Sequence, residues 1–341
     1  MEEIRVNRLP LLTYRYLHTN DTPLDFEAPK EMGEIAFSDT TYVTEGGTLP
    51  ADFDGASKET VAACQAGPAY TIRIPEGQTA SLTITLTARP HLAGQFLFYI
   101  EKGASLSLVW RVVGDEVEGT SLHAAYYELD KDAQLTVSTL EQGHAKTIVY
   151  DQRHVVLAEG AKAHFTGAEL SGEKIIVHSY GKLLGKKSEM VEKAVYAAKE
   201  KQHLDLFYHI DHIGEETKAE IDVKGALSDE SKKIFRGTLD FKRGCSGSVG
   251  DEGDYAIQLD PKTKNISLPL LLCTEDNVQG NHASSAGQLD ANTIYFLMSR
   301  GFSLEEARRI VVEALIRPII DEMDESIREE VLSAVREKLD K

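Results

Sequence analysis

The chain has 341 residues, which is enough for one large domain or two ordinary domains with proper cores. It carries 37 lysines and arginines against 55 aspartates and glutamates, and this net charge of −18 argues against nucleic acid or an anionic membrane as the main partner. Cys64, Cys245 and Cys273 lie far apart and form no CxxC pair, so the sequence predicts neither a disulfide framework nor a cysteine-bound metal site within the chain. The N-terminus lacks an apolar signal segment and the longest apolar run has six residues, so we expect a cytoplasmic protein.

The first seventy residues contain many breakers of regular structure. Five prolines between Pro10 and Pro68, together with Gly46-Gly47, interrupt every run before a long helix or strand can form. We therefore expect residues 1–70 to form an irregular N-terminal cap.

From about residue 70 the sequence alternates polar and apolar side chains with the period of a β-strand, as in Ser81–Leu86. A tight turn followed by a small, a polar and an apolar residue recurs along this region. The turn alanines of three copies, Ala104, Ala133 and Ala161, are 29 and 28 residues apart. A fixed period in the twenties predicts a stacked repeat, here a parallel β-helix over residues 71–288. A two-sheet β-sandwich is the alternative.

Helix signals concentrate in the last fifty residues, and upstream of them Glu189–Lys201 is the one candidate for a long helix. Within residues 289–341, Asp290 can cap a helix that stops at Gly301, and Ser303 begins a capping box for the next helix. The apolar faces predicted for the second and third helices are Ala307, Ile310, Val311, Ala314 and Leu315, and then Ile327, Val331, Val335 and Leu339.

Five candidate metal ligands lie within ten residues: His203, Asp205, His209, Asp211 and His212. In an unbroken strand the first four share one face and His212 lies on the other. Imidazole and carboxylate ligands suit zinc, manganese or iron, so a metal-dependent hydrolase is an alternative function. A polar strand face with hydrogen-bonded histidines is the favoured interpretation, because no HExxH or HxH spacing is present.

Two cysteines invite different predictions. Cys245 lies in a glycine-rich segment, Gly244–Gly250, that fits neither a phosphate loop nor a nucleophile elbow. A flexible turn is the favoured interpretation of this segment, and Cys245 is the candidate for a sulfur-handling thiol. Cys273 follows three leucines, so we expect it to be a buried small hydrophobe.

Two segments carry a family resemblance. Residues 202–237 contain H-L-D, I-D-H, K-G-A-L-S-D-E and F-R-G in that order. Residues 276–307 contain D-N-V-Q-G-N-H-A-S-S-A-G-Q-L-D followed by Y-F-L-M-S-R-G-F-S-L-E-E-A. In order and spacing, both segments resemble the SufB/SufD family of iron–sulfur cluster assembly proteins.

The resemblance implies a right-handed parallel β-helix with a C-terminal helical domain. Members of the family form a complex with SufC, an ABC-type ATPase that docks on the C-terminal helices. This implies that Tyr295, Phe296, Arg300 and Gly301 bind a SufC-like partner. SufB and SufD pair with each other, and a nascent cluster is thought to build at their interface. The resemblance therefore implies a non-catalytic scaffold that pairs with a SufB-like protein.

The sequence departs from the family pattern at positions that bear on identity. Gly280 stands where SufD-type sequences have cysteine, and Asn281 stands where SufB-type sequences have glutamate. The SufB-like N-terminal cysteine cluster is also absent, so the chain resembles a short SufD-like member. The resemblance makes His282 a candidate iron ligand at the partner interface, where a transient iron–sulfur cluster would be held with the partner. It implies no cofactor bound tightly by the chain alone.

Several alternatives stay open at this point. Flavin binding by the complex and homodimer formation by the isolated chain are both compatible with the resemblance. Besides a metal-dependent hydrolase, a carbohydrate-active β-helix enzyme is the remaining alternative function, and it would need paired carboxylates on an exposed face.

Overall fold

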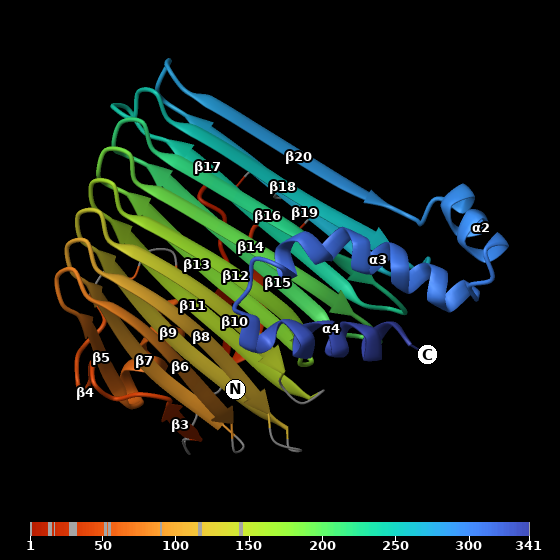
Figure 1. Cartoon of the computed structure of the whole chain (residues 1–341), viewed down its shortest axis with the longest axis horizontal. Helices are drawn as coiled ribbons and strands as arrows, with labels where there is room; N and C mark the ends of the chain where they lie inside the picture. The colour runs from red at the N-terminus through yellow and green to blue at the C-terminus, as the bar shows by residue number, and fades with distance from the viewer. Residues whose placement is uncertain are drawn as a thin grey trace.

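The structure is a computed structural model of the chain that describes residues 2–12, 16, 18–26, 33–50, 53, 56–88, 91–114, 118–142 and 146–340. It is mainly β, a β-solenoid of about 7 turns in which the chain passes alternately through two long sheets. Figure 1 shows the strands stacked along the solenoid, with helices over one face. The predicted parallel β-helix is confirmed, and the parallel pairing of successive turns excludes the β-sandwich.

Among the described residues each sheet has nine strands. Sheet 1 contains, in spatial order, β20 (Gln279–Gly287), β18 (Val249–Gln258), β16 (Lys218–Leu227), β14 (Glu189–Ala198), β12 (Lys162–Ser171), β10 (Gln134–Gln142), β8 (Ser105–Gly114), β6 (Thr79–Ala88) and β3 (Glu34–Phe37). Sheet 2 contains β19 (Lys264–Cys273), β17 (Lys232–Phe241), β15 (His203–His212), β13 (Lys174–Leu183), β11 (Thr147–Leu157), β9 (Gly119–Leu129), β7 (His91–Ile100), β5 (Ala69–Ile74) and β4 (Val43–Glu45). From β5 onward alternate strands in the sequence are parallel neighbours, whereas β3 and β4 pair antiparallel with β6 and β5. The inner faces of the two sheets enclose the main hydrophobic core.

The repeating alanines mark the corners of the solenoid. Ala104, Ala133 and Ala161 are buried in the core, where only a small side chain fits beside the turn. The residue before each alanine has a positive φ, 63° at Gly103, 57° at Asp132 and 68° at Gly160. Glycine adopts this left-handed conformation without steric cost and aspartate tolerates it better than most residues, which explains the Gly-Ala and Asp-Ala pairs at the corners.

The helix predicted at Glu189–Lys201 is wrong, because this segment forms strand β14. Met190, Glu192 and Tyr196 alternate toward the core. Strand β14 is hydrogen-bonded on both sides, to β12 and β16. Two parallel neighbours supply hydrogen-bond partners along most of the strand, and this tertiary pairing overrides the helix propensity of a segment rich in alanine, glutamate and lysine.

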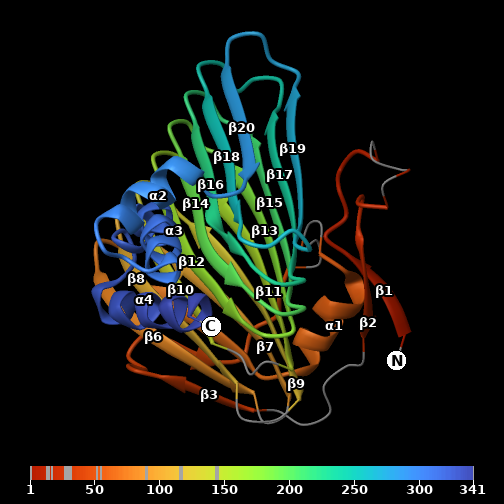
Figure 2. The same ribbon diagram turned by 90° about the vertical axis from the view of Figure 1, so that its right-hand side faces the viewer.

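The N-terminal segments cover the outer face of sheet 2, as Figure 2 shows. Strands β1 (Glu2–Val6) and β2 (Thr22–Phe26) form an antiparallel hairpin, and helix α1 (Lys58–Ala66) packs beside them. Ser57 caps α1 by accepting a hydrogen bond from the backbone of Thr60. The sequence did not predict this helix. The division of the chain at residues 70 and 288 stays a prediction.

Three helices follow the last strand: α2 (Ala291–Ser299), α3 (Leu304–Ile320) and α4 (Glu325–Leu339). The predicted caps are confirmed, since Asp290 accepts a hydrogen bond from the Thr293 backbone and Ser303 forms a full capping box with Glu306. Gly301 has a φ of 98°, as expected for the residue after a helix. Across the part of the chain that the structure describes, no helix has the length and apolar character needed to cross a membrane.

Helices α3 and α4 lie on the outer face of sheet 1 and form a second core with it. The predicted stripe of α4 is confirmed at Ile327, Val331 and Val335, which are buried. The stripe predicted for α3 is largely wrong, because apart from Ala307 the buried residues are Val312, Ile316, Ile319 and Ile320. Helix α3 has apolar residues around most of its circumference, and contact with sheet 1 and α4 decides which of them are buried.

Candidate functional site at the open end of the solenoid

The solenoid is open at its last turn. Strands β19 and β20 each pair with one neighbour, and no strand among the described residues pairs with their other edge. Side chains that point inward on this turn are therefore exposed, including Leu271, Cys273 and His282. The prediction that Cys273 is buried is wrong for this reason. Its register partner one turn earlier, Phe241, is buried, but no further turn of the described chain covers Cys273.

His282 lies on the inner face of β20, directly beside Glu252 of β18 in the register. Burial, together with the nearby charge of Asp254, raises the pKa of Glu252 to about 8. Glu252 is therefore protonated at neutral pH and can act as a hydrogen-bond donor next to an exposed imidazole. Both residues line an open hollow of about 320 Å³. The sequence analysis missed Glu252, although one solenoid turn of 30 residues separates it from His282.

Gly280 lies on the same inner face and is closely packed. A Cβ atom at this position would come within 2.8 Å of Leu271 Cδ1 and 3.1 Å of Phe241 Cε2. A larger side chain therefore requires Leu271 to move. The leucine therefore fills the space that a side chain at residue 280 would need.

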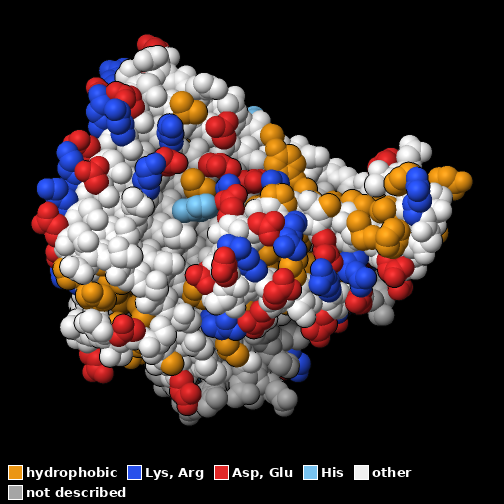
Figure 3. Space-filling model, in the orientation of Figure 1, with side chains coloured by type: hydrophobic (Ala, Val, Ile, Leu, Met, Phe, Trp, Pro, Cys, Tyr) orange, Lys and Arg blue, Asp and Glu red, His pale blue; other side chains and the backbone are white. Residues whose placement is uncertain are grey.

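Helix α2 presents a second exposed surface. None of its nine residues is buried, and its contacts lie mainly with α3. The exposed apolar side chains on and beside this helix, here called the α2 surface, are Tyr295, Phe296, Met298, Phe302 and Leu304. Figure 3 shows these orange side chains gathered at the projecting end of the molecule. The guanidinium of Arg300 lies 5.1 Å from the centre of the Phe296 ring, and Gly301 ends the helix.

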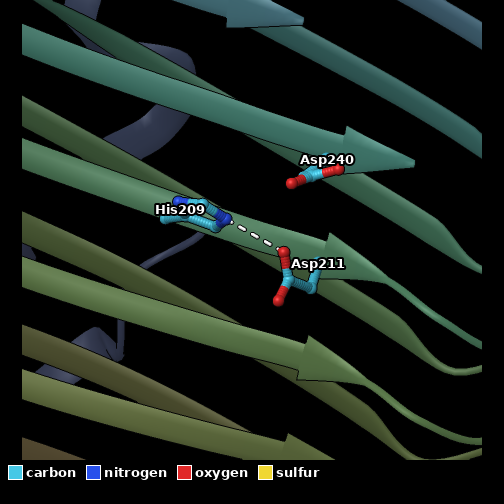
Figure 4. Close-up of side chains that lie close together, drawn as sticks. All are labelled: His209, Asp211 and Asp240. Carbon is cyan, nitrogen blue, oxygen red and sulfur yellow. Dashed lines mark hydrogen bonds and ion pairs between the residues drawn. The ribbon is translucent and has the colours of Figure 1, made fainter. Parts of the chain in front are cut away.

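The predicted metal-ligand cluster is split by the fold. His209 and Asp211 lie together on the outer face of β15, and Asp240 of β17 joins them, as Figure 4 shows. His209 Nε2 lies 2.9 Å from Asp211 Oδ1, the Tyr180 hydroxyl donates to Asp211 Oδ2 at 2.8 Å, and Lys242 contacts both carboxylates. The ammonium of Lys242 already neutralises the charge of one aspartate, so these contacts favour the hydrogen-bonded strand face over a metal centre.

The other three residues of the predicted cluster lie apart. Asp205 binds Arg236 and the N-terminal segment. His212 faces inward, stacks on Phe241 and bonds Thr217 Oγ1 at 2.7 Å. His203 stands at the start of β15 and lines a separate hollow. The predicted alternation of faces is confirmed, with His212 opposite the other four, but the five side chains do not form one site.

Cys245 is buried against the main core beside the turn that ends β17. Burial raises the pKa of its thiol, although a contact with Ser248 acts in the opposite direction. A buried thiol with a raised pKa is a poor nucleophile and a poor ligand at neutral pH. A sulfur-handling role for Cys245 would require this turn to open, and it stays a prediction.

The solenoid interior holds a charged cluster that the sequence analysis missed. Arg153 of β11 donates to Asp151 at 2.9 Å and to Glu192 of β14 at 3.2 Å. Burial acts to raise the pKa of Asp151, but the charge of Arg153 outweighs it and holds this pKa at about 2. The sequence contains a signal for this cluster, because its charged residues occupy positions that the strand alternation assigns to the buried face.

Glu141 and Glu169 complete this interior cluster. They are partners in the register of β10 and β12, and both are buried. Burial raises the pKa of Glu169 to about 7 and that of Glu141 well above its usual value. Two adjacent buried carboxyl groups avoid mutual repulsion when at least one of them retains its proton. This pair is enclosed by the two sheets, so it gives no support to a carbohydrate-active site.

The raised pKa of Glu169 makes stability depend on pH. The folded state retains a proton that the unfolded state loses above about pH 4.5, so the carboxyl group favours folding at low pH and loses this advantage as pH rises toward 7. In the original chain the free energy of unfolding should fall by up to about 1.4 kcal/mol per pH unit over this range. We expect Glu169→Gln to abolish this fall. Urea denaturation at pH 5, 6, 7 and 8 measures it. Glu128→Gln, at an exposed position, is the control, and equal slopes in all three proteins would contradict the prediction.

A comparison with known families bears directly on these surfaces. The family model described as "SUF system FeS cluster assembly, SufBD core domain" matches residues 84–315. The chain belongs to the SufBD family. The matched core domain includes Glu252, His282 and α2, and it ends within α3, whereas the N-terminal hairpin and α4 lie outside it.

Curated SufBD relatives agree with this assignment. The chain is 29% identical over 148 residues to the iron–sulfur cluster assembly protein SufD of Bacillus subtilis, an alignment that covers 43% of this chain and 34% of that protein. It is 23% identical over 235 residues to an iron–sulfur cluster assembly SufBD family protein of Staphylococcus saprophyticus, covering 67% and 50%. It is 22% identical over 235 residues to SufB of Bacillus subtilis, also covering 67% and 50%. The chain thus spans between about a third and a half of the length of these relatives, and the predicted resemblance is confirmed.

Proposed function

We propose that this SufBD chain is a non-catalytic, cytoplasmic scaffold subunit of an iron–sulfur cluster assembly machinery. In this proposal it pairs with a SufB-like protein at the open end of the solenoid and binds a SufC-like ABC ATPase through α2. The chain alone turns over no substrate. The iron–sulfur cluster is its cargo, held transiently with the partner, and any flavin belongs to the assembled complex.

The α2 surface is the observation that carries the proposal. Tyr295 is 75% exposed and Phe296 is 54% exposed, although aromatic side chains of this size are normally buried. A projecting amphipathic helix with unpartnered aromatic side chains is a common means of recognising another protein. The capped ends at Asp290 and Gly301 hold this helix in shape without a partner, so the surface is preformed.

The open end of the solenoid supports the second interface. Strands β19 and β20 offer two rows of unpaired backbone groups, and such edges readily pair with another chain. Another solenoid of the same family has edges of the same kind. Pairing there would bury His282 and Cys273 between two proteins, so that one imidazole and one thiol of this chain face the partner. His282 is the ligand that we propose for iron at that interface.

Co-purification tests the ATPase interface. A tagged chain is expressed with the SufB-like and SufC-like proteins of the same genome, and the recovered subunits are quantified. We expect Phe296→Asp to weaken recovery of the ATPase by roughly 30-fold or more, because the loss of a central aromatic side chain typically costs about 2 kcal/mol or more. Recovery of the SufB-like subunit should not change.

Leu184→Asp is the matched control, because Leu184 is an exposed apolar residue, 47% accessible, on a solenoid turn far along the chain. It should leave ATPase recovery unchanged. Failure of the unmodified chain to recover either partner would overturn the proposed function. Loss of both partners in the Phe296 variant would instead contradict the assignment of α2 to the ATPase.

A further inference from the structure

A ladder of lysine and histidine side chains crosses sheet 2 at the start of its strands. Lys174, His203, Lys232 and Lys264 are the first residues of β13, β15, β17 and β19, and each is the register partner of the next. Neighbouring strands lie about 4.8 Å apart, so the four backbone positions span roughly 14 Å. Three lysines are therefore held close together on a protein whose net charge is −18.

The ladder lines an open hollow of about 700 Å³, here called the lysine hollow. Lys201 and Lys262 from the adjoining turns add two further ammonium groups to its wall. Its single carboxylate, that of Glu230, already accepts from Lys262 at 2.8 Å. The wall therefore carries a marked excess of positive charge.

The lysines of the ladder lack ion-pair partners within the described ranges, which distinguishes them from other lysines of the solenoid. Elsewhere a lysine on one turn is matched by a glutamate on the next. Lys131 bonds Glu159 at 3.0 Å, and Lys186 bonds Glu215 at 3.0 Å. The fold therefore provides a regular means of neutralising turn lysines, and the ladder does not use it.

Such an arrangement is unfavourable for folding. Like charges directly opposite each other on neighbouring strands are destabilising. Burial lowers the pKa of Lys232, and the positive charges of Lys264 and Arg236 add to this effect, although the negative charge of Asp205 opposes it. Burial and the positive charges of Lys232 and Lys174 lower the pKa of His203 to about 4, although the negative charge of Asp205 opposes this shift, so the imidazole is neutral at pH 7. The Nε2 atom of that imidazole is buried and has no hydrogen-bond partner in the described structure.

We propose that the lysine hollow binds the phosphate groups of a small, multiply phosphorylated molecule. Several ammonium groups and one neutral imidazole match a ligand with several charged oxygens, because lysine binds phosphate as a point charge and its flexible stem lets the groups converge. A bound oligophosphate would relieve the repulsion within the ladder. This site lies on sheet 2, and its proposal does not depend on the proposed scaffold function.

Isothermal titration of the purified full chain with inorganic tripolyphosphate tests the proposal. We expect saturable binding that weakens as salt is raised, since the contacts are ionic. The double variant Lys232→Gln, Lys264→Gln is expected to weaken binding by roughly tenfold or more for each lysine removed. Because the substitutions remove like charges, the variant should unfold at the same temperature as the original chain or higher. That result shows that the variant is folded.

Lys131→Gln is the matched control, since this lysine lies on a solenoid turn but is paired, and it should bind tripolyphosphate normally. ATP in a parallel titration separates two sources of the same chemistry. Equal affinity for ATP and tripolyphosphate shows that the hollow recognises the phosphate groups alone. Higher affinity for ATP shows that the natural ligand is a nucleotide. No saturable binding of either, or equal affinity for citrate, or an equal loss in the Lys131 variant, would overturn the proposal.

Discussion

Replacement of Lys233 by methionine is expected to destabilise the folded chain by about 3–5 kcal/mol, the cost of leaving a buried charge without its partner. The Lys233 side chain points into the solenoid and is fully buried, as is the carboxylate of Asp254, with which it forms an ion pair. Its ammonium also lies 5.1 Å from the ring centre of Tyr196. Burial lowers the pKa of Lys233, and Asp254 counteracts that effect.

The double variant Lys233→Met, Asp254→Leu removes both charges of the buried ion pair. With both charges gone, the desolvation cost disappears along with the attraction, so stability should return to within about 1–2 kcal/mol of the original. Urea denaturation at neutral pH measures all three proteins. Lys131→Met, which breaks an exposed ion pair, should change nothing measurable. A single Lys233 variant as stable as the original chain would show that Asp254 takes up a proton at little cost.

The fold of this protein could be predicted from local sequence signals because its repeat is regular. The spacing of Ala104, Ala133 and Ala161 set the turn length, and the caps at Asp290 and Ser303 identified the last helices. Segment 189–198 could not be predicted in the same way. Its helix propensity competes with pairing to strands 27 residues before and 29 residues after it, and a local pattern does not contain those partners.

The candidate site was only partly predictable, for a related reason. His282 was found through a family motif, but Glu252 and Asp240 come beside their partners only when adjacent turns are in register. The exposure of Cys273 depends on the absence of a further turn over β19, which an apolar sequence such as Leu270-Leu271-Leu272 does not reveal. The polar interior was not predicted, because Arg153, Asp151 and Glu192 compensate each other only once the fold brings β11 and β14 together inside the solenoid.

Replacement of Asp205 by alanine should release the N-terminal hairpin from sheet 2. Asp205 accepts from Asn7 Nδ2 at 2.8 Å, from Thr22 and from Arg236, so one carboxylate joins both ends of the hairpin to the solenoid. Arg236 is fully buried and also donates to the backbone oxygen of Thr19 at 2.9 Å. Removal of the carboxylate leaves a buried guanidinium without its counter-charge, and we expect a loss of about 3–5 kcal/mol.

The expected consequence is local as well as global, because the Asp205 carboxylate links Asn7 and Thr22 of the hairpin to Arg236 of sheet 2. Limited proteolysis with trypsin, followed by mass spectrometry, should show faster cleavage at Arg5 and Arg8 in the Asp205→Ala variant, since a detached strand exposes its backbone. Asp21→Asn is the control, since it removes only the ion pair of Asp21 with Arg5 on the solvent side of the hairpin. Asp205→Asn retains an oxygen acceptor and should give an intermediate rate. If cleavage in Asp205→Ala matches that in the control, then the apolar contacts of Ile4, Val6 and Leu24 hold the hairpin without the carboxylate.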